Sequence, residues 1–317
     1  MLDDDDVPPI DWEALANTYV VANGKGGVGK TTLASNFAGL VAADAAASDG
    51  DAGRVLLIDV NGQGNVGRDL GYRGTSIDDE GAAFYEALRT GKPLEPVSGV
   101  RPGLDVVIGG AHIGAAPDML QATYRMRQHR QVLALAVCLA PIARRYDLVV
   151  IDSAPENPPL QQIALSSARW MIAPTRSDRA SINDGLGSIS RQFQLVRKAV
   201  NPHLRLLGVV LFGSGSASKQ IHRRARAWVA EELGDDAYLF DTIVRYSEAV
   251  GQDARHHGRL VHELEEAVAS NPKFWDLRSG RAGTDTTVVS ATSVSVAEDL
   301  ANLAREILTR AAEEDAV

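Results

Sequence analysis

The residues with the clearest chemical potential form one short glycine-rich segment, residues 24–31. Its sequence, Gly-Lys-Gly-Gly-Val-Gly-Lys-Thr, matches the phosphate-binding pattern G-x-x-x-x-G-K-S/T. In such a loop, glycines allow backbone N–H groups to converge on phosphate oxygens, and Lys30 reaches the β- and γ-phosphates. The Thr31 hydroxyl binds Mg²⁺ in this arrangement. The residues expected to hold a nucleotide are Gly26, Gly27, Val28, Gly29, Lys30, Thr31 and Thr32.

An alternation of apolar strands and helices must position this segment. Apolar, β-branched runs predict strands at residues 18–22, 55–59, 104–108, 148–152, 170–173 and 207–211. Helical patterns lie between and after them, at residues 31–43, 79–90, 116–144, 183–199, 217–233 and 295–312. Strands that are apolar on both faces and alternate with helices are typical of a parallel sheet covered on both sides. The sequence therefore predicts an α/β fold with a single doubly wound, mainly parallel sheet and helices on both faces.

The charge of the chain is concentrated at its two ends. The formal net charge is −9, but residues 1–17 carry six acidic and no basic residues, and residues 313–317 carry three acidic ones. The body between them is neutral, so the acidic average does not exclude a basic patch that binds nucleic acid. We expect a disordered acidic arm over residues 1–17, one domain over residues 18–312 with a mobile loop at about 278–294, and an acidic tail over residues 313–317.

Composition places the chain among soluble globular proteins. Hydrophobic residues make up 45% and charged residues 23% of its 317 residues, which excludes a mainly disordered chain. The single cysteine, Cys138, excludes an intrachain disulfide, an iron–sulfur cluster and a cysteine-type zinc site, and its apolar neighbours indicate a packing role. No signal peptide opens the chain, and no uncharged run approaches the ~18 residues of a membrane span. We therefore expect a cytoplasmic protein without a membrane partner.

The glycine-rich segment also carries the feature that points to a family. Residues 24–32, Gly-Lys-Gly-Gly-Val-Gly-Lys-Thr-Thr, resemble the deviant Walker A motif of the ParA/MinD family of ATPases. In that family the additional lysine touches the phosphates of the facing subunit in a nucleotide-sandwich dimer, so the resemblance implies that Lys25 acts in trans. It also implies the P-loop NTPase fold, ATP and Mg²⁺ as cofactors, and an ATP-dependent homodimer.

Further stretches extend the resemblance over residues 18–265 and 295–310. Residues 146–155 resemble the Walker B stretch of the family, in which Asp152 would hold a Mg²⁺-bound water. Residues 243–249 resemble the late segment that lies beside the base pocket. The resemblance therefore adds Asp152 to the expected metal site, which already includes the hydroxyl of the phosphate loop.

One stretch departs from the family pattern at the residue that handles the attacking water. The family usually has Asp-x-Asp-Pro-Gln-Gly-Asn, whereas this chain has Asn61 for the second aspartate and Gly62 for the proline. An amide orients water through hydrogen bonds but cannot accept a proton as a carboxylate does, so we expect slow hydrolysis with nucleotide binding retained. The alternative is that Asn61-Gly62 forms only a tight turn. Asp59 is retained and would support the Mg²⁺ shell. The expected catalytic residues are Lys25, Lys30, Asp59 and Asn61.

A basic stripe on a predicted helix is the candidate surface for DNA. Lys219, Arg223 and Arg226 are spaced i, i+4 and i+7, so they share one face, whereas Ala225 and Val229 lie on the other. Members of the resembled family bind DNA without sequence preference through basic residues late in the chain, and phosphate contacts need only clustered cations. The alternative is a solvated helix face without a partner.

The resemblance implies a partition ATPase. ATP binding would drive dimerisation, the dimer would bind DNA in the nucleoid, and a ParB-type centromere-binding protein would stimulate hydrolysis. A MinD-like membrane-positioning ATPase is one alternative, although anionic lipid would repel the acidic C-terminal end of this chain. A non-hydrolysing scaffold locked by nucleotide is a second alternative, suggested by Asn61. An amide-bond-forming synthetase is a third, which Lys25 disfavours.

Overall fold

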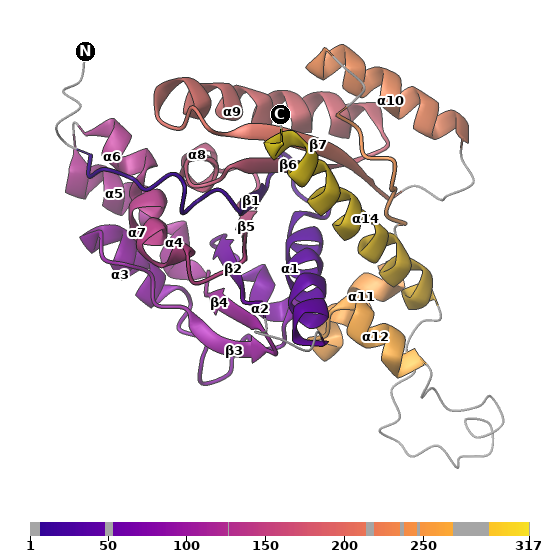
Figure 1. The fold of residues 1–317 in the computed structure, drawn as a ribbon, viewed down its shortest axis with the longest axis horizontal. Coiled ribbons are helices and arrows are strands. Elements are labelled where there is room, and N and C mark those ends of the chain that lie inside the picture. Colours follow the sequence, from indigo (N-terminus) through magenta and orange to yellow (C-terminus); the bar gives the residue numbers. More distant parts are fainter. Residues whose placement is uncertain are drawn as a thin grey trace.

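A seven-stranded sheet in the order β3-β4-β2-β5-β1-β6-β7 forms the centre of the computed structural model (Figure 1). The structure describes residues 7–47, 53–125, 127–213, 219–234, 238–245, 248–268 and 292–316. The strands are β1 (Thr18–Val21), β2 (Val55–Val60), β3 (Val97–Arg101), β4 (Leu104–Val107), β5 (Leu148–Ser153), β6 (Trp170–Arg176) and β7 (Arg205–Phe212). All neighbouring strands run parallel except β3 and β4. The predicted doubly wound, mainly parallel sheet is therefore confirmed.

The burial of the strands follows from their sequences. β2 and β5 are buried at every position, because each is an apolar run that packs helices on both faces. β3 lies at the edge of the sheet, and its sequence Val-Ser-Gly-Val-Arg is buried at no position. The sequence patterns did not predict β3, because an exposed edge strand lacks the continuous apolar run by which the buried strands are recognised.

Helices cover both faces of the sheet, as expected. One core cluster joins the sheet to α3 (Ala82–Thr90), α5 (Ala116–Tyr124), α7 (Ala134–Ala143), α8 (Pro158–Ser166), α9 (Gly187–Ala199) and α10 (Lys219–Leu233). The other joins it to α1 (Lys30–Ala47), α2 (Asn65–Asp69), α11 (Glu248–His257), α12 (Val261–Val268) and α14 (Thr292–Asp315). Three further short elements belong to the described part of the chain: α4 (Ala111–Gly114), α6 (Gln128–Val132) and a π-helical turn, η2 (Ser181–Leu186). None of the helices in the described ranges is long and apolar enough to span a membrane.

Part of the predicted helical region is interrupted. The pattern predicted one mostly helical stretch over residues 116–144, but the structure divides it into α5, α6 and α7. The first break falls at Arg125, whose φ of +36° lies outside the helical region. Cys138 lies within α7, is fully buried, and its thiol donates to the carbonyl of Ala87 at 3.2 Å. Its expected packing role is consistent with this environment.

The N-terminal boundary of the folded body differs from the prediction. Residues 1–17 were expected to form a disordered arm, yet within the described residues 7–17 Leu15 is only 2% exposed and Trp12 packs against the core. The carboxylate of Asp11 pairs with the Arg144 guanidinium at 2.9 Å. Apolar side chains spaced among the acidic ones bury enough surface to hold residues 7–17 against the body, and a count of charges misses this. Residues 1–6 lie outside the described residues.

The C-terminal boundary also differs. The last helix was expected at residues 295–312, but α14 runs from Thr292 to Asp315 and includes most of the predicted acidic tail. The carboxylates of Glu314 and Asp315 pair with Arg205 and Arg169 at 3.5 and 3.2 Å. These pairs neutralise the acidic end of the helix against the sheet. Residues 278–291 of the predicted mobile loop lie outside the described residues.

Candidate nucleotide-binding site

The glycine-rich segment lies where β1 ends and α1 begins. Gly27 and Gly29 have φ angles of +70° and +95°, in the left-handed region that favours glycine. A Cβ atom at Gly29 would lie 2.7 Å from the ring of Phe212, which ends β7. The predicted strand–loop–helix arrangement is therefore confirmed. The glycines are required both for backbone angles and for close packing.

Lys30 holds its charge inside this loop. The residue is 5% exposed, and its Nζ donates to the carbonyl oxygen of Lys25 at 2.6 Å. Burial lowers the pKa of Lys30 to about 8, although the carboxylates of Asp152 and Glu156 act in the opposite direction. The ammonium group is thus fixed by a backbone oxygen of its own loop, at the start of α1, and lies in the field of two carboxylates.

Lys25 turns toward its own chain. Its Nζ donates to the hydroxyl of Ser181 at 3.2 Å, in the first turn of η2. The Ser181 amide in turn donates to the Asp178 carboxylate at 2.8 Å. The backbone amide of Lys25 donates to the Asn23 side chain at 2.8 Å, which fixes the loop before the lysine. The ammonium groups of Lys25 and Lys30 therefore have separate hydrogen-bond partners.

Two buried carboxylates lie at the ends of neighbouring strands beside the loop. Asp59 on β2 is in register with Asp152 on β5, and both residues are fully buried. Burial raises the pKa of Asp152 to about 7, although hydrogen bonding from Thr31 and the charge of Lys30 lower it. Burial, followed by the charge of Asp152, raises the pKa of Asp59 well above its ordinary value. Burial therefore destabilises the charged forms of both carboxylates, and a bound cation would stabilise them.

The donor groups at this point suit Mg²⁺. The Thr31 hydroxyl donates to Asp152 Oδ2 at 2.7 Å, and one oxygen of each carboxylate, Asp59 Oδ1 and Asp152 Oδ1, has no hydrogen-bond partner. The described part of the chain holds no cluster of three or more His, Cys, Asp or Glu residues that would bind a metal by itself. Mg²⁺ commonly takes one or two protein ligands and completes its shell with water and phosphate oxygens. The residues present therefore fit a Mg²⁺ ion that arrives with a phosphate ligand.

Asn61 both shapes a turn and faces the site. Its side-chain oxygen accepts from the Gln63 amide at 3.0 Å, and its backbone oxygen accepts from the amides of Gly64 and Gly110. The residue is 3% exposed and lines the same cavity as the phosphate loop. Asn61 thus belongs to a tight turn and also lines the cavity, so the tight-turn interpretation and the interpretation as a water-orienting amide are compatible.

A cavity of about 410 Å³ lies beside the phosphate loop, within the usual range of ligand pockets, about 300–1,000 Å³. Among the residues that line it are Gly27, Val28, Gly29, Lys30, Thr31, Thr32 and Asn61. The structure therefore brings together six of the seven predicted nucleotide-binding residues and Asn61, the residue expected to orient water, whereas Gly26 is not among the residues that line the cavity. Asp59 and Asp152 lie beneath this surface rather than on it.

The sequence patterns missed most of the far wall of this cavity. Arg68 on α2, Arg255 at the end of α11 and Arg259 after it line the cavity, and all three are exposed. We call these three residues the arginine wall. No described residue forms an ion pair with them. Their neighbour Asp69 is buried, and its pKa is raised to about 6 because burial outweighs the charges of Arg255 and Arg68. The i, i+4 spacing of Arg255 and Arg259 was the available signal, but it carries no indication of a cavity.

The late segment expected beside the base pocket does line the cavity, through Arg245. Its guanidinium donates to Asp299 Oδ1 at 3.1 Å, and its backbone amide donates to Asp299 Oδ2 at 3.0 Å. Asp299 belongs to α14, so the last helix of the chain fixes this part of the wall. Residues 246 and 247 of the segment lie outside the described residues.

The predicted DNA-binding stripe lies on α10, none of whose described residues lines the cavity. Ala225 and Val229 are fully buried, so α10 is amphipathic as predicted. Arg223 is exposed on the opposite face, whereas the guanidinium of Arg226 pairs with Asp241 at 3.3 Å. The side chain of Lys219 lies outside the described residues.

Comparisons with known proteins agree with this geometry. A family model described as an AAA domain matches residues 16–206, more than half of the chain. The chromosome-partitioning ATPase Soj of Thermus thermophilus is 32% identical over 224 residues, which cover 69% of this chain and 80% of that protein. The chromosome partitioning protein ParA of Myxococcus xanthus is 30% identical over 217 residues, which cover 67% of this chain and 70% of that protein.

Solved structures show the same fold. The ATP complex of McdA from Cyanothece aligns with a TM-score of 0.68 at 19% sequence identity, covering 92% of this chain and 96% of that one. The phosphate loop, the strand order and the sequence identity to the two partition proteins all lead to one assignment. The chain belongs to the ParA/Soj family of P-loop ATPases.

Proposed function

We propose that this chain is an ATP-dependent DNA partition protein. It binds ATP with Mg²⁺, dimerises, binds DNA without sequence preference and is released when a ParB-type centromere-binding protein stimulates hydrolysis. The observation that carries the proposal is the phosphate loop with two lysines in distinct environments, Lys30 buried within it and Lys25 held outside it. The partition functions of the Thermus and Myxococcus relatives support the same proposal.

The phosphate loop supplies the binding step. Its backbone amides and Lys30 hold the β- and γ-phosphates, and the ligand displaces the contact between Lys30 Nζ and the Lys25 carbonyl. Mg²⁺, when bound, neutralises charge that develops on the phosphates. Thr31 and Asp152 hold this ion, and Asp59 supports them from the neighbouring strand.

Hydrolysis is slow in this proposal because the water is oriented by an amide. Asn61 faces the cavity and forms hydrogen bonds, but it accepts no proton. Phosphoryl transfer depends mainly on positioning and charge stabilisation, so the loss of one carboxylate slows turnover and leaves binding intact. The same observation favours a second candidate function, a scaffold that binds nucleotide and does not hydrolyse it.

Dimerisation and DNA binding use the remaining lysine and α10. Lys25 exchanges its contact with Ser181 for the phosphates of a facing subunit, where it acts in trans. The predicted basic residues of α10, Lys219, Arg223 and Arg226, contact DNA phosphates. The protein is then associated with the nucleoid when ATP is bound.

Co-sedimentation of the full chain with DNA tests the proposal. Two DNA fragments of unrelated sequence are compared, with ATP·Mg²⁺ and without nucleotide, and Lys30→Ala serves as the control that lacks the phosphate contact. We expect both fragments to be bound equally and only with ATP. DNA binding that is equal with and without ATP, or no DNA binding in either condition, would contradict the partition function. Measurable ATP turnover by the DNA-bound form would exclude the scaffold.

A further inference from the structure

The far wall of the nucleotide cavity depends on a corner of the chain outside the sheet. Residues 258–260 connect α11 to α12, and this corner carries Arg259, whereas Arg255 lies one turn earlier on α11. Leu260 and Val261 also line the cavity. The positions of Arg255 and Arg259 within the arginine wall are therefore set by whatever holds the α11–α12 corner against the body.

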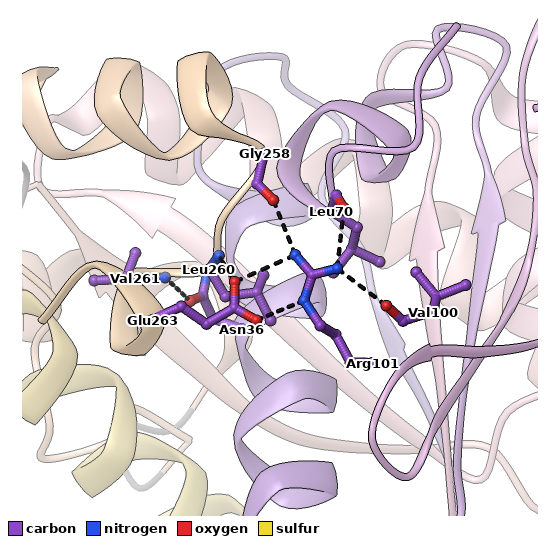
Figure 2. Close-up of polar contacts among 8 residues, drawn as sticks. All are labelled: Asn36, Leu70, Val100, Arg101, Gly258, Leu260, Val261 and Glu263. Carbon is purple, nitrogen blue, oxygen red and sulfur yellow. Dashed lines mark hydrogen bonds and ion pairs between the residues drawn. The ribbon is translucent and has the colours of Figure 1, made fainter. Parts of the chain in front are cut away.

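Arg101, the last residue of β3, holds this corner against the edge of the sheet (Figure 2). Its Nε and Nη2 donate to the Glu263 carboxylate at 2.5 and 3.3 Å, and Nη2 also donates to the Gly258 carbonyl at 2.9 Å. Its Nη1 donates to the carbonyls of Leu70 and Val100 at 3.2 and 3.0 Å. A guanidinium has five N–H donors, and these five bonds use all of them. One side chain thus joins the sheet edge, the end of α2 and the α11–α12 corner.

Glu263 transmits this contact to the start of α12. Its Oε2 accepts from the Leu260 amide at 2.8 Å, three residues earlier, in the manner of the acidic residue of a capping box. Burial acts to raise the pKa of Glu263, but hydrogen bonds from Arg101 and the Leu260 amide outweigh it, and the pKa lies below its ordinary value. The carboxylate therefore stays charged between the guanidinium and the helix start.

The same corner also rests on the helix that follows the phosphate loop. Asn36 on α1 accepts from the Val261 amide at 2.8 Å (Figure 2). Its side chain also donates to the Thr32 carbonyl at 2.8 Å. Gly258 and Gly71 pack backbone to backbone, so that a Cβ atom on Gly258 would overlap Gly71. The corner is thus held by contacts from the end of β3, from α1 and from Gly71.

The arginine wall carries positive charge that would attract an anion. Three exposed arginines line one cavity, and the buried carboxylate of Asp69 feels the charges of two of them, Arg255 and Arg68. Arg255 folds back along α11, with Nη2 at 3.9 Å from the position of a Cβ on Gly251, which itself lines the cavity. Cations gathered in a concave site raise the local potential for an anionic ligand.

We propose that Arg101 is a positioning residue for the nucleotide site. By fixing the α11–α12 corner, it keeps the arginine wall beside the phosphate loop as a second anion subsite for the phosphates of a nucleoside triphosphate. The proposal rests on the nucleotide binding of the proposed function. It assigns Arg101 no contact with the ligand, since all five of its donors are used within the protein.

Isothermal titration of the full chain with ATP·Mg²⁺, at several salt concentrations, tests this role in a double-mutant cycle. The variants are Arg101→Gln, the pair Arg255→Gln with Arg259→Gln, and all three together. Arg54→Gln is the matched control, because Arg54 pairs with Asp105 at 2.5 Å near the same sheet edge but away from the cavity. Thermal unfolding of each variant reports whether the fold is kept.

We expect Arg101→Gln to weaken ATP binding about tenfold, to flatten its salt dependence, and to have almost no further effect once Arg255 and Arg259 are replaced. Arg54→Gln should leave the affinity unchanged. If Arg101→Gln lowers the ATP affinity equally with and without Arg255 and Arg259 in place, Arg101 is only structural and the proposal is overturned. An affinity unchanged by Arg101→Gln would also overturn it. Should Arg101→Gln fail to fold, Arg101→Lys, which keeps the charge but has three donors, replaces it in the cycle.

Lys30→Ala, measured in parallel, separates this proposal from the function on which it rests. If Lys30→Ala retains its affinity for ATP, the nucleotide site itself is wrong and the role of Arg101 falls with it. If Lys30→Ala loses ATP binding while Arg101→Gln does not, the nucleotide site stands and only the positioning role is overturned.

Discussion

The phosphate loop and helix α10 both present cations, but they hold them in opposite ways. Lys30 is 5% exposed, its Nζ donates to the Lys25 carbonyl, and the charges of Asp152 and Glu156 act to raise its pKa. Arg223 on α10 is exposed, and the side chain of Arg226 is 40% exposed where it pairs with Asp241. One region thus fixes a single cation inside the protein, and the other displays several cations to solvent.

The difference predicts two kinds of binding. A buried, hydrogen-bonded cation is pre-oriented for one ligand geometry, so its removal costs most of the affinity. Exposed cations act through screened interactions that depend on salt and sum over many weak contacts. The loop is therefore suited to a compact ligand with defined phosphate positions, and α10 is suited to a repetitive phosphate backbone.

The largest effect should come from Lys30→Ala. We expect ATP affinity to fall at least about a hundredfold, because the phosphates lose a charge-assisted hydrogen bond in a buried loop. Isothermal titration with ATP·Mg²⁺ measures this fall. The control is Lys198→Ala, which removes an exposed lysine at the end of α9 and should have no effect. An unchanged ATP affinity of Lys30→Ala would show that the buried lysine of the loop does not bind the phosphates, and the contrast with α10 would be wrong.

Asn61→Asp tests whether the amide of Asn61 limits the rate of ATP hydrolysis. We expect single-turnover hydrolysis to become faster by up to about 10²-fold, near the lower end of general-base contributions, because the amide already orients water. ATP affinity should change little. The aspartate can accept the Gln63 amide as the asparagine does, so the turn is kept.

Gln63→Glu is the matched control for this substitution, since it adds a carboxylate in the same turn at an exposed position. Its hydrolysis rate should equal that of the wild type. If Asn61→Asp and the wild type hydrolyse ATP at the same rate, the amide does not limit turnover, and Asp59 or a residue of the partner does its work.

Lys25→Ala tests whether the second lysine of the loop serves a facing subunit. We expect dimerisation with a non-hydrolysable ATP analogue to weaken at least about tenfold, because the phosphates of the facing subunit no longer meet this cation, while monomer binding of ATP persists. Light scattering at a series of protein concentrations measures it. Ser181→Ala removes the hydrogen bond of Lys25 within its own chain and should leave the dimer intact. A Lys25→Ala variant that dimerises fully would remove this lysine from the interface.

The smallest single effects should come from α10. Replacing Lys219, Arg223 and Arg226 by alanine should weaken DNA binding alike for any sequence and flatten its salt slope by up to about 0.9 for each phosphate that the replaced side chains neutralise. Arg223→Ala alone should cost more than Arg226→Ala, because Asp241 already partly neutralises Arg226. Fluorescence anisotropy over a salt series measures these slopes, with Arg191→Ala on α9 as the exposed-arginine control. Unchanged slopes would leave α10 as a solvated face.

Local patterns in the sequence were sufficient for the fold class and for the phosphate loop. Buried strands such as β2 are continuous apolar runs, and the loop is one uninterrupted segment between a strand and a helix, so neighbours in sequence are neighbours in space. The same patterns failed for β3, which is exposed at the sheet edge, and for α11 and α12, which follow the last predicted strand without a distinct signal. They also failed for residues 7–17, where spaced apolar side chains pack although acidic residues dominate the composition.

The sequence by itself determined the chemistry of the loop, because its glycines, Lys30 and Thr31 all lie within residues 24–31, where the backbone amides and the two side chains are neighbours in the chain. Only the tertiary structure decided what faces the loop. Arg101 and Glu263 are 162 residues apart in the chain, and neither belongs to a motif, yet together they hold the α11–α12 corner. Contacts between distant segments form when the sheet order and helix packing bring their backbones together, and no local spacing encodes that proximity. The arginine wall and the turn that presents Asn61 to the cavity are properties of the folded chain for the same reason.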